Sequence, residues 1–262
     1  MALRKYFKSW LILTTKSFQV ELVSRFSTVL FIAAKIFRFA FFLVFLIILG
    51  NNTKLVQNYT LWQMIFFFSV FNLIDGLPQF FLREVYRFRN YVVSGDFDYF
   101  LTKPLSPLFR SLFGGADILD IPMILISFGF VIFSAFKIGD IAPSGVLLFA
   151  ILLLNGCLLA FAIHIFILAL GVLTTEIENA VWIYRDVTQL GRIPIDVYKE
   201  PLRGLITFVI PVGIMMTFPA KALMGLLSWQ FVVISISVSV LILLVSLKFW
   251  QFALTKYSSA SS

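Results

Sequence analysis

The sequence predicts an all-α integral membrane protein, with about six transmembrane helices and an amphipathic helix at the membrane interface before them. Of its 262 residues, 60% are hydrophobic and only 13% are charged, whereas soluble domains carry about 45–50% apolar and about 25% charged residues. The apolar residues gather in stretches of roughly 20, the length that spans a bilayer. These observations exclude a soluble enzyme or a secreted domain. Because six spans use most of the chain, we expect one transmembrane domain over residues 1–262.

Residues 1–25 have the pattern of an amphipathic helix that lies in the membrane surface. Large apolar side chains recur at three- and four-residue steps, and basic residues stand between them. The apolar positions are Leu3, Phe7, Trp10, Leu11 and Phe18, and the basic ones are Arg4, Lys5, Lys8 and Lys16. This arrangement suits an interfacial helix with its basic face toward anionic headgroups. The alternative is a plain cytosolic extension, which would leave Phe7 and Trp10 exposed without a role.

Six hydrophobic stretches follow this segment. They are Thr28–Leu49, Leu61–Leu82, Ala116–Phe136, Pro143–Leu173, Gly204–Ala220 and Trp229–Phe249. The fifth is the shortest, and it contains Pro211 and Pro219. It is therefore either a bent span or a partly re-entrant segment.

The basic residues predict the orientation of these spans. Sixteen of the 21 fall on one side, namely Arg4, Lys5, Lys8, Lys16, Arg25, Arg83, Arg87, Arg89, Lys103, Arg110, Arg185, Arg192, Lys199, Arg203, Lys248 and Lys256. The opposite loops hold Lys54, Lys137 and Lys221. By the positive-inside rule, both termini and the hydrophilic stretches 83–115 and 174–203 are expected in the cytoplasm of a cell-membrane protein. The same rule accounts for the net charge of +8, so we expect a lipid surface and no nucleic acid as partner.

Catalytic and metal-binding motifs are missing from the chain. It has no G-x-x-x-x-G-K-[ST], H-E-x-x-H, C-x-x-C or G-x-S-x-G sequence. Its single cysteine, Cys157, excludes an intrachain disulfide. His164 lies in the middle of the fourth stretch, where it is either a functional group or a structural hydrogen-bonding group. Because no acidic residue is near it in sequence, we favour a structural bond to a neighbouring helix.

Charged residues inside the spans are candidates for functional sites. Lys35 and Asp75 each lie about seven residues from the cytoplasmic end of their stretch, and Arg38 lies one turn beyond Lys35. We predict that Lys35 or Arg38 pairs with Asp75; the alternative is that each side chain extends separately to the headgroups. Asp117 and Asp120 either line the inner mouth of the protein or favour the start of a helix, and we prefer the second interpretation.

The stretch 83–115 contains the most patterned polar sequence. Gly95 and Asp96 indicate a turn. Phe97, Phe100 and Leu101 then form a short apolar stripe at helical spacing before Pro104 ends it. Such a short helix suits docking into a cleft of another protein, and it equally suits a connector that lies on the surface.

Two blocks of this sequence resemble a branch of the ABC-2 type transporter permeases. The run Ser94-Gly95-Asp96-Phe97-Asp98-Tyr99-Phe100-Leu101-Thr102-Lys103-Pro104, followed by Pro107 and Phe109, is similar to the branch's G-x-x-D-x-x-L-x-x-P-x-x-P loop. The second block comprises Arg192-Ile193-Pro194, Pro201-Leu202-Arg203, Thr207-Phe208-Val209-Ile210-Pro211 and Phe218-Pro219-Ala220-Lys221-Ala222-Leu223-Met224-Gly225. It is similar to the branch's P…LR…TFVIP…P-A-x-x-L-x-G pattern. Both blocks lie where a six-span chain of this length would have them.

The resemblance implies a permease subunit of an ABC exporter. Such a subunit works with a second permease, identical or related, and with separate ATPase subunits that bind ATP and Mg²⁺, so this chain itself would bind no cofactor. The resemblance also implies that the loop between the second and third spans contacts the ATPase. Carried over to this chain, the contact residues are Gly95, Asp96, Asp98, Leu101 and Pro104.

The alternative function is a proton-coupled secondary transporter that uses Asp75 and His164. Such a transporter is expected to have an inverted repeat and several intramembrane acids. This chain shows no inverted repeat and few intramembrane acids. A membrane enzyme or scaffold is a third possibility, and it lacks a convergent set of catalytic residues.

Overall fold

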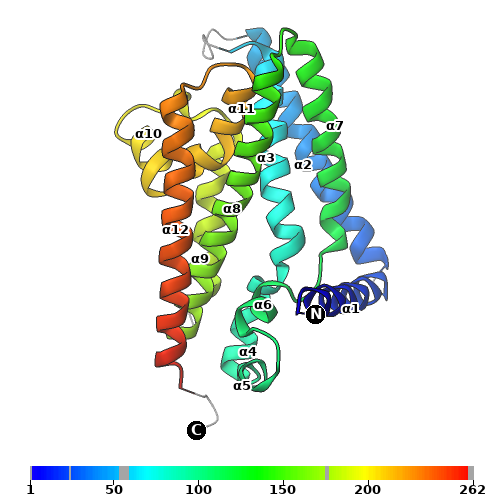
Figure 1. The fold of residues 1–262 in the computed structure, drawn as a ribbon. Helices are drawn as coiled ribbons and strands as arrows, with labels where there is room; N and C mark the ends of the chain where they lie inside the picture. The colour runs from blue at the N-terminus through cyan, green and yellow to red at the C-terminus, as the bar shows by residue number, and fades with distance from the viewer. Residues whose placement is uncertain (1, 24, 53–58, 175–176, 259–262) are drawn as a thin grey trace.

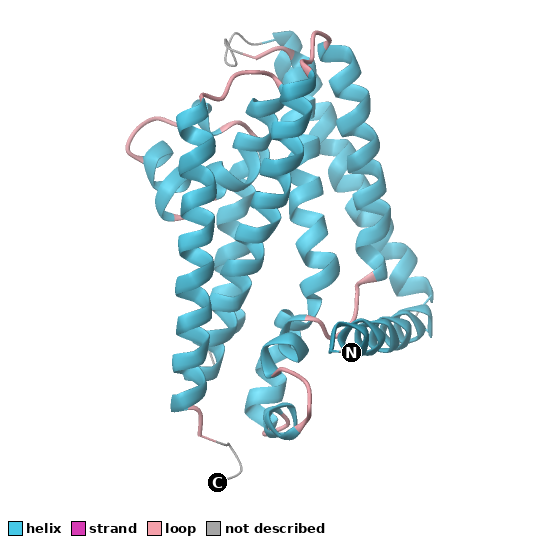
Figure 2. Cartoon of the chain, viewed as in Figure 1, coloured by secondary structure: helices cyan, strands magenta, loops and turns pink. Residues whose placement is uncertain are grey.

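The computed structural model describes residues 2–23, 25–52, 59–174 and 177–258 (Figure 1). Helices and the loops between them make up this part of the chain, which contains no strand (Figure 2). The long helices are α1 (Ala2–Val23), α2 (Arg25–Asn52), α3 (Leu61–Leu82), α7 (Ile121–Ile138), α8 (Pro143–Thr174), α9 (Ile177–Thr188) and α12 (Trp229–Lys256). The short α-helices are α4 (Phe88–Ser94), α5 (Phe97–Thr102), α6 (Pro107–Leu112), α10 (Leu202–Gly204) and α11 (Phe218–Leu223). The 3₁₀ and π segments are η2 (Arg83–Arg87), η3 (Ile118–Asp120), η4 (Gln189–Arg192), η5 (Ile195–Val197), η6 (Leu205–Val209) and η7 (Gly213–Thr217).

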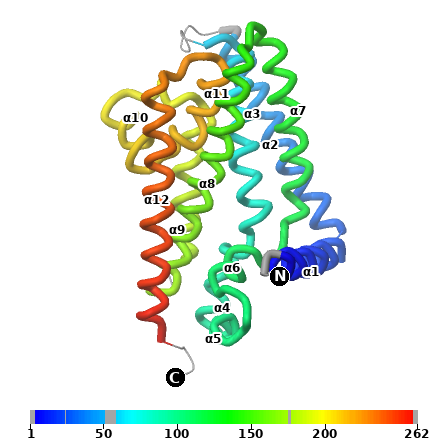
Figure 3. The backbone as a smooth tube through the Cα atoms, in the orientation of Figure 1, coloured from blue at the N-terminus to red at the C-terminus, as the bar shows by residue number. Residues whose placement is uncertain are grey.

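The long helices lie side by side in a bundle, and α1 crosses one end of it (Figure 1). The segment α4–α6 and the C-terminal end of α12 lie at this same end, as the tube in Figure 3 shows. We call it the basal end, and the end that holds Tyr59 and Lys137 the far end. The crosswise placement of α1 is the arrangement expected of an interfacial helix.

Within the described residues, five helices are long and apolar enough to cross a membrane, in agreement with five of the six predicted stretches. They are Arg25–Gly50, Leu61–Ser94, Ile118–Ile138, Pro143–Thr174 and Trp229–Lys256. The third begins slightly later than predicted because Asp117 accepts a 2.9 Å hydrogen bond from the Leu119 amide and starts η3. The prediction of an all-α membrane protein is therefore confirmed.

The sequence predicted that the stretch 174–203 is a loop on the same side as 83–115. The structure contradicts this prediction. Helix α9 leaves the basal end beside α8, and the chain then reaches the far end (Figure 1). There the Asp196 carboxylate accepts hydrogen bonds from the Tyr59 hydroxyl at 2.7 Å and from Lys221 at 2.8 Å. Residues 177–197 therefore carry the chain through the bundle. Hydropathy does not detect this route, because α9 carries Glu178, Arg185 and Asp186 among its apolar residues.

Near the far end of the bundle, residues 202–223 form a bent pair of helices rather than a straight span. Leu202–Val209 and Gly213–Leu223 meet at an angle of 78°. The bend falls at Pro211, which has no amide hydrogen to continue the helical ladder, and both flanking turns, η6 and η7, are π-helical. A bend alone fits either alternative for the fifth stretch, a bent span or a re-entrant segment. Asp196, before the pair, is hydrogen-bonded to Lys221, near its end, so the chain enters and leaves at the same end of the bundle, as a re-entrant segment does. We call residues 202–223 the re-entrant hairpin.

Helix α8 packs closely against the re-entrant hairpin. A side chain added at Gly156 would place its Cβ 2.6 Å from the carbonyl oxygen of Met215, so only glycine fits there. The side of α3 that faces this contact is buried and aromatic, with Phe66 and Phe67 almost fully enclosed. This core fixes the hairpin to the bundle and so determines where the polar residues on its neighbours lie.

Candidate functional site

The loop after α4 turns sharply at Gly95 and forms the short helix α5. Gly95 has φ of 80°, a left-handed conformation that glycine adopts without strain. Two members of the predicted apolar stripe, Phe97 and Phe100, point inward and are buried, while Leu101 is 40% exposed. The sequence predicted the turn and the helix, but it did not show that most of the stripe packs inside this chain.

Helix α5 is attached to the two ends of the chain. The Tyr257 hydroxyl donates a 3.0 Å hydrogen bond to the Asp98 carboxylate, and the Phe97 ring packs edge-on against Tyr257. Lys5, on α1, donates a 2.6 Å hydrogen bond to the carbonyl oxygen of Pro104. The outward face of the loop carries Asp96, Tyr99 and Leu101, all exposed. The loop that carries this face is therefore in contact with α1 and with the residue that follows α12.

A buried carboxylate that the sequence analysis did not single out holds the base of this loop. Glu84 is 2% exposed and pairs with Arg110 at 2.7 Å. It also accepts a 2.8 Å hydrogen bond from the Tyr91 hydroxyl, and Arg87 lies 3.8 Å away. The signal for this site in the sequence is a single acid within a basic run, Arg83 to Arg89. The pairing joins η2, α4 and α6 into one unit.

The predicted partner of Lys35 is wrong. The Lys35 ammonium binds the Asp120 carboxylate, and it also lies 3.4 Å from the carbonyl oxygen of Leu119. Arg83 pairs with Asp117 at 3.1 Å. Because η3 sits beside α2 and α3, it brings both carboxylates to the level of these two cations. Asp117 and Asp120 thus serve as ion-pair partners, in addition to the capping of η3 by Asp117.

Asp75 has a different environment. Within the described residues, no ion pair closer than 4.0 Å joins it to Lys35 or Arg38. Its charged neighbours include Arg185, on α9, and Arg38, on α2. One of these neighbours therefore lies on α9, a helix whose path through the bundle the sequence did not predict.

His164 forms its hydrogen bond within its own helix rather than to a neighbour. Its Nδ1 lies 2.7 Å from the carbonyl oxygen of Ala160, so Nδ1–H is the donor. Nε2 is buried without a partner, and the ring packs edge-on against Tyr184 with centroids 5.0 Å apart. The prediction of a structural role agrees with this geometry, but the predicted interhelical bond is wrong.

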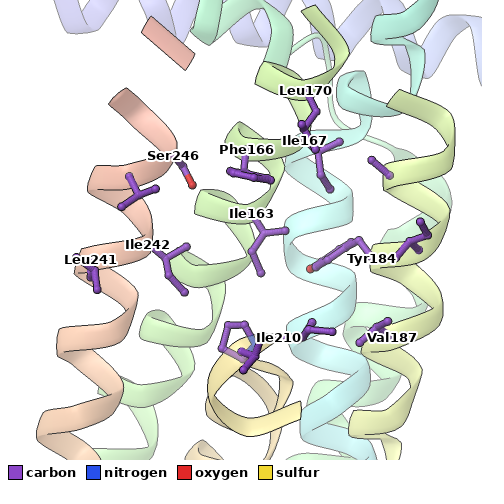
Figure 4. A pocket seen from close by; sticks show the side chains of 15 residues that line it. Ile163, Phe166, Ile167, Leu170, Tyr184, Val187, Ile210, Leu241, Ile242 and Ser246 are labelled. Atoms are coloured by element: carbon purple, nitrogen blue, oxygen red, sulfur yellow. The ribbon is translucent and has the colours of Figure 1, made fainter. Parts of the chain in front are cut away.

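A groove of about 560 Å³ opens between α8, α9, α12 and the re-entrant hairpin. Figure 4 shows side chains from all four pointing into it. Its walls are apolar, and the hydroxyls of Ser246 and Tyr184 are among its few polar groups. Such a groove offers no counter-charge to an ionic group.

Comparison with known protein families identifies the chain. A family profile described as an ABC-2 family transporter protein matches residues 13–261, almost the whole chain. The chain belongs to the ABC-2 transporter family. No curated protein and no solved structure gives a significant match. An ABC-2 protein is the membrane-spanning permease component of an ABC transporter and works with an ABC ATPase. The family assignment made from the Ser94–Pro104 loop and the second block is thus confirmed.

Proposed function

We propose that this ABC-2 protein is the permease subunit of an ATP-driven exporter. It would pair with a second permease, identical or related, and with two ATPase subunits that are separate chains. ATP and Mg²⁺ would bind to those subunits, in keeping with the lack of a P-loop motif in this sequence. Family membership favours this mechanism over the proton-coupled alternative through Asp75 and His164.

The observation that carries the proposal is the placement of α5. It presents exposed Tyr99 and Leu101 at the basal end, and Asp98 and Pro104 attach it to α12 and α1. Gly95 supplies the turn that projects the helix. These are the properties that a contact with an ATPase requires: an accessible face and a rigid connection to the transmembrane helices.

The proposed mechanism transmits force and involves no bond chemistry in this chain. When ATP draws the two ATPase subunits together, each would push on α5 of its permease. The bonds from Asp98 to Tyr257 and from Glu84 to Arg110 would pass this movement to α12 and to the base of α3. Coupling then requires that the ATPase contact α5 differently in two states of the permease.

We infer that the basal end faces the cytoplasm of a cell-membrane protein, with both termini there. The basic residues of α1 and of the segment 83–110 gather at this end, as the positive-inside rule requires. This orientation still holds although part of the stretch 174–203 lies at the far end, because most of the basic residues are in α1, in the segment 83–110 and at Lys256. Lys199 and Arg203 move to the far end.

Co-expression with a P-loop ATPase encoded by a neighbouring gene tests the proposal. We expect the two chains to purify as one complex, with two copies of each kind of subunit, and the ATPase to be faster in the complex than alone. The double variant Tyr99→Ala with Leu101→Ala should abolish this stimulation. A double variant of Trp229 and Phe231, which are exposed at the far end, is the matched control. Transport that continues in ATP-depleted vesicles would contradict the proposal.

A further inference from the structure

Two arginines from different helical segments, Arg38 and Arg192, line one small cavity at membrane depth. Arg38 is the fourteenth of the 28 residues of α2, so it lies roughly 20 Å along the helix axis from either end. The Arg192 guanidinium, at the end of η4, lies 5.6 Å from the centre of the Phe42 ring, one turn beyond Arg38 on α2. Arg38 and Asp75 are both charged neighbours of Arg192. We call these two residues the arginine pair.

Neither arginine has an acidic partner in the described part of the chain. The ion pairs shorter than 4.0 Å there include Lys35 with Asp120 and Arg83 with Asp117, but none with Arg38 or Arg192. Arg192 is held by aromatic contacts instead, to Phe42 and to the Phe71 ring at 5.9 Å. Asp75 is a more distant counter-charge to both arginines, and it is shared with Arg185. The three arginines therefore outnumber this one carboxylate.

The surroundings of the arginine pair are polar on one side. With Lys35, both residues line a small cavity whose other wall includes the Asn72 side chain. The Asn72 amide donates to the carbonyl oxygen of Phe68. The remaining lining is apolar, from Phe39, Phe42, Phe68 and Met123. Arg38 is exposed at the surface of the bundle, and Arg192 is half-buried.

An unpaired guanidinium cannot face lipid at this depth without a large cost. An arginine at the centre of a bilayer is costly, and such residues line cavities or ligand paths. Arg38 lies too far from either end of α2 for its side chain to reach the headgroups. Its exposed surface must therefore meet water or an anion when the transporter is assembled.

We propose that the arginine pair binds an anionic group of the transported molecule. The cargo class would be an amphipathic anion with a phosphate or carboxylate group, because guanidinium groups bind both through paired hydrogen bonds. The cavity is only about 20 Å³, so the apolar portion of the same molecule would lie outside it, along exposed side chains of α2 such as Phe37 and Phe41. This inference deepens the proposed function and rests on it, since it names the cargo class of the exporter.

A carboxylate from a second copy of this chain is the competing occupant. Asp120 is occupied by Lys35, and Asp75 lies beside Arg185. The remaining candidate is Asp186, which is exposed on α9. If Asp186 of one copy neutralised Arg38 of the other, the pair would hold the dimer together and would not bind cargo.

Binding of hexadecyl phosphate to the purified full chain in phosphatidylcholine nanodiscs tests the proposal without the ATPase. We expect hexadecyl phosphate to bind at least about tenfold more tightly than the neutral hexadecanol and the cationic hexadecyltrimethylammonium, since a charged hydrogen bond contributes on that order. Arg38→Gln and Arg192→Gln should each weaken binding of the phosphate about tenfold or more. Arg38→Lys should retain part of it, because the charge remains without the paired donors.

One control variant completes the experiment. Lys248→Gln removes an exposed cation of α12 outside this cavity and should leave binding unchanged. Equal affinity for the three probes, or unchanged binding in both arginine variants, would overturn the proposal. The proposal would also be overturned if Arg38→Gln and Asp186→Asn each lost the dimer. Because no ATPase is present, a failed coupling experiment leaves this result intact, and a failure here leaves the coupling through α5 unaffected.

Discussion

The Asp98 carboxylate on α5 accepts a 3.0 Å hydrogen bond from the hydroxyl of Tyr257, 159 residues further along the chain. This contact joins the loop after α4 to the basal end of α12. It gives the exposed face of α5 a direct mechanical connection to a helix that spans the whole bundle. The proposed coupling depends on it.

We expect Tyr257→Phe to reduce transport more than it reduces assembly. The substitution removes the hydroxyl and keeps the ring, which still packs against Phe97. A hydrogen bond to a charged acceptor contributes about 1.5–3 kcal/mol. Because the bond between Asp98 and Tyr257 is partly exposed to solvent, we expect a contribution at the lower end of this range. Stimulation of the ATPase should therefore fall several-fold while the complex still purifies intact. Unchanged stimulation would show that α5 does not act through Tyr257.

Glu84→Gln should destabilise the basal end strongly. Removing one partner of a buried ion pair costs about 3–5 kcal/mol, and Glu84 is 2% exposed beside Arg110. Thermal unfolding in detergent, followed by the fluorescence of a thiol-reactive dye at Cys157, measures the change. Glu178→Gln is the matched control, because its pair with Arg89 is exposed and 3.8 Å long, and it should have little effect. Equal midpoints for the two variants would contradict the assigned role of Glu84.

Lys199 should be accessible from the same side of the membrane as Lys137. Lys199 is exposed and follows Asp196 by three residues, and Asp196 contacts Tyr59 and Lys221 at the far end. In a Cys157→Ser background, an impermeant maleimide added to intact cells should label Lys199→Cys and Lys137→Cys. It should label Leu101→Cys only after permeabilisation. If Lys199→Cys, like Leu101→Cys, were labelled only after permeabilisation, the structure would be contradicted and the cytoplasmic loop predicted from the sequence would be supported.

Acidification should loosen the re-entrant hairpin. Burial on its own would raise the pKa of Asp196, but the hydrogen bonds from Lys221 and Tyr59 and the Lys221 charge lower this pKa below its ordinary value. A carboxylate with a lowered folded-state pKa contributes stability above its unfolded-state pKa, and loses it as the pH falls through the folded value. Wild-type protein should therefore lose thermal stability in acid, below about pH 4. Asp196→Asn should be less stable at neutral pH and should lose less on acidification; parallel pH curves for both proteins would contradict this.

Most of the spans could be predicted from the sequence because these helices are long and apolar on nearly every side, whether they face lipid or the inside of the bundle. The predicted stretch Leu61–Leu82 coincides with α3, and Pro143–Leu173 differs from α8 by one residue. Helix α9 escaped this test because it is short and has charges on one face. Because the sequence did not reveal that α9 crosses the bundle, Lys199 was predicted at the basal end, whereas it lies at the far end.

The charged contacts could not be predicted in the same way. Lys35 and Asp120 are separated by 85 residues, and their pairing depends on how α2 and η3 are aligned. The sequence indicated which charges lie at membrane depth, but it contained no information about that alignment. The turn at Gly95 and the short helix after it were predictable because their signals are local.

Cross-linking from α5 to the ATPase tests the central claim most directly. In a Cys157→Ser background, Leu101→Cys carries a single thiol on the exposed face of α5, and a short bifunctional reagent can join it to the co-expressed ATPase. We predict a cross-linked product whose yield changes when ATP and vanadate are added, and no product from Lys137→Cys at the far end. No product from Leu101→Cys in an intact, ATP-hydrolysing complex would contradict coupling through α5.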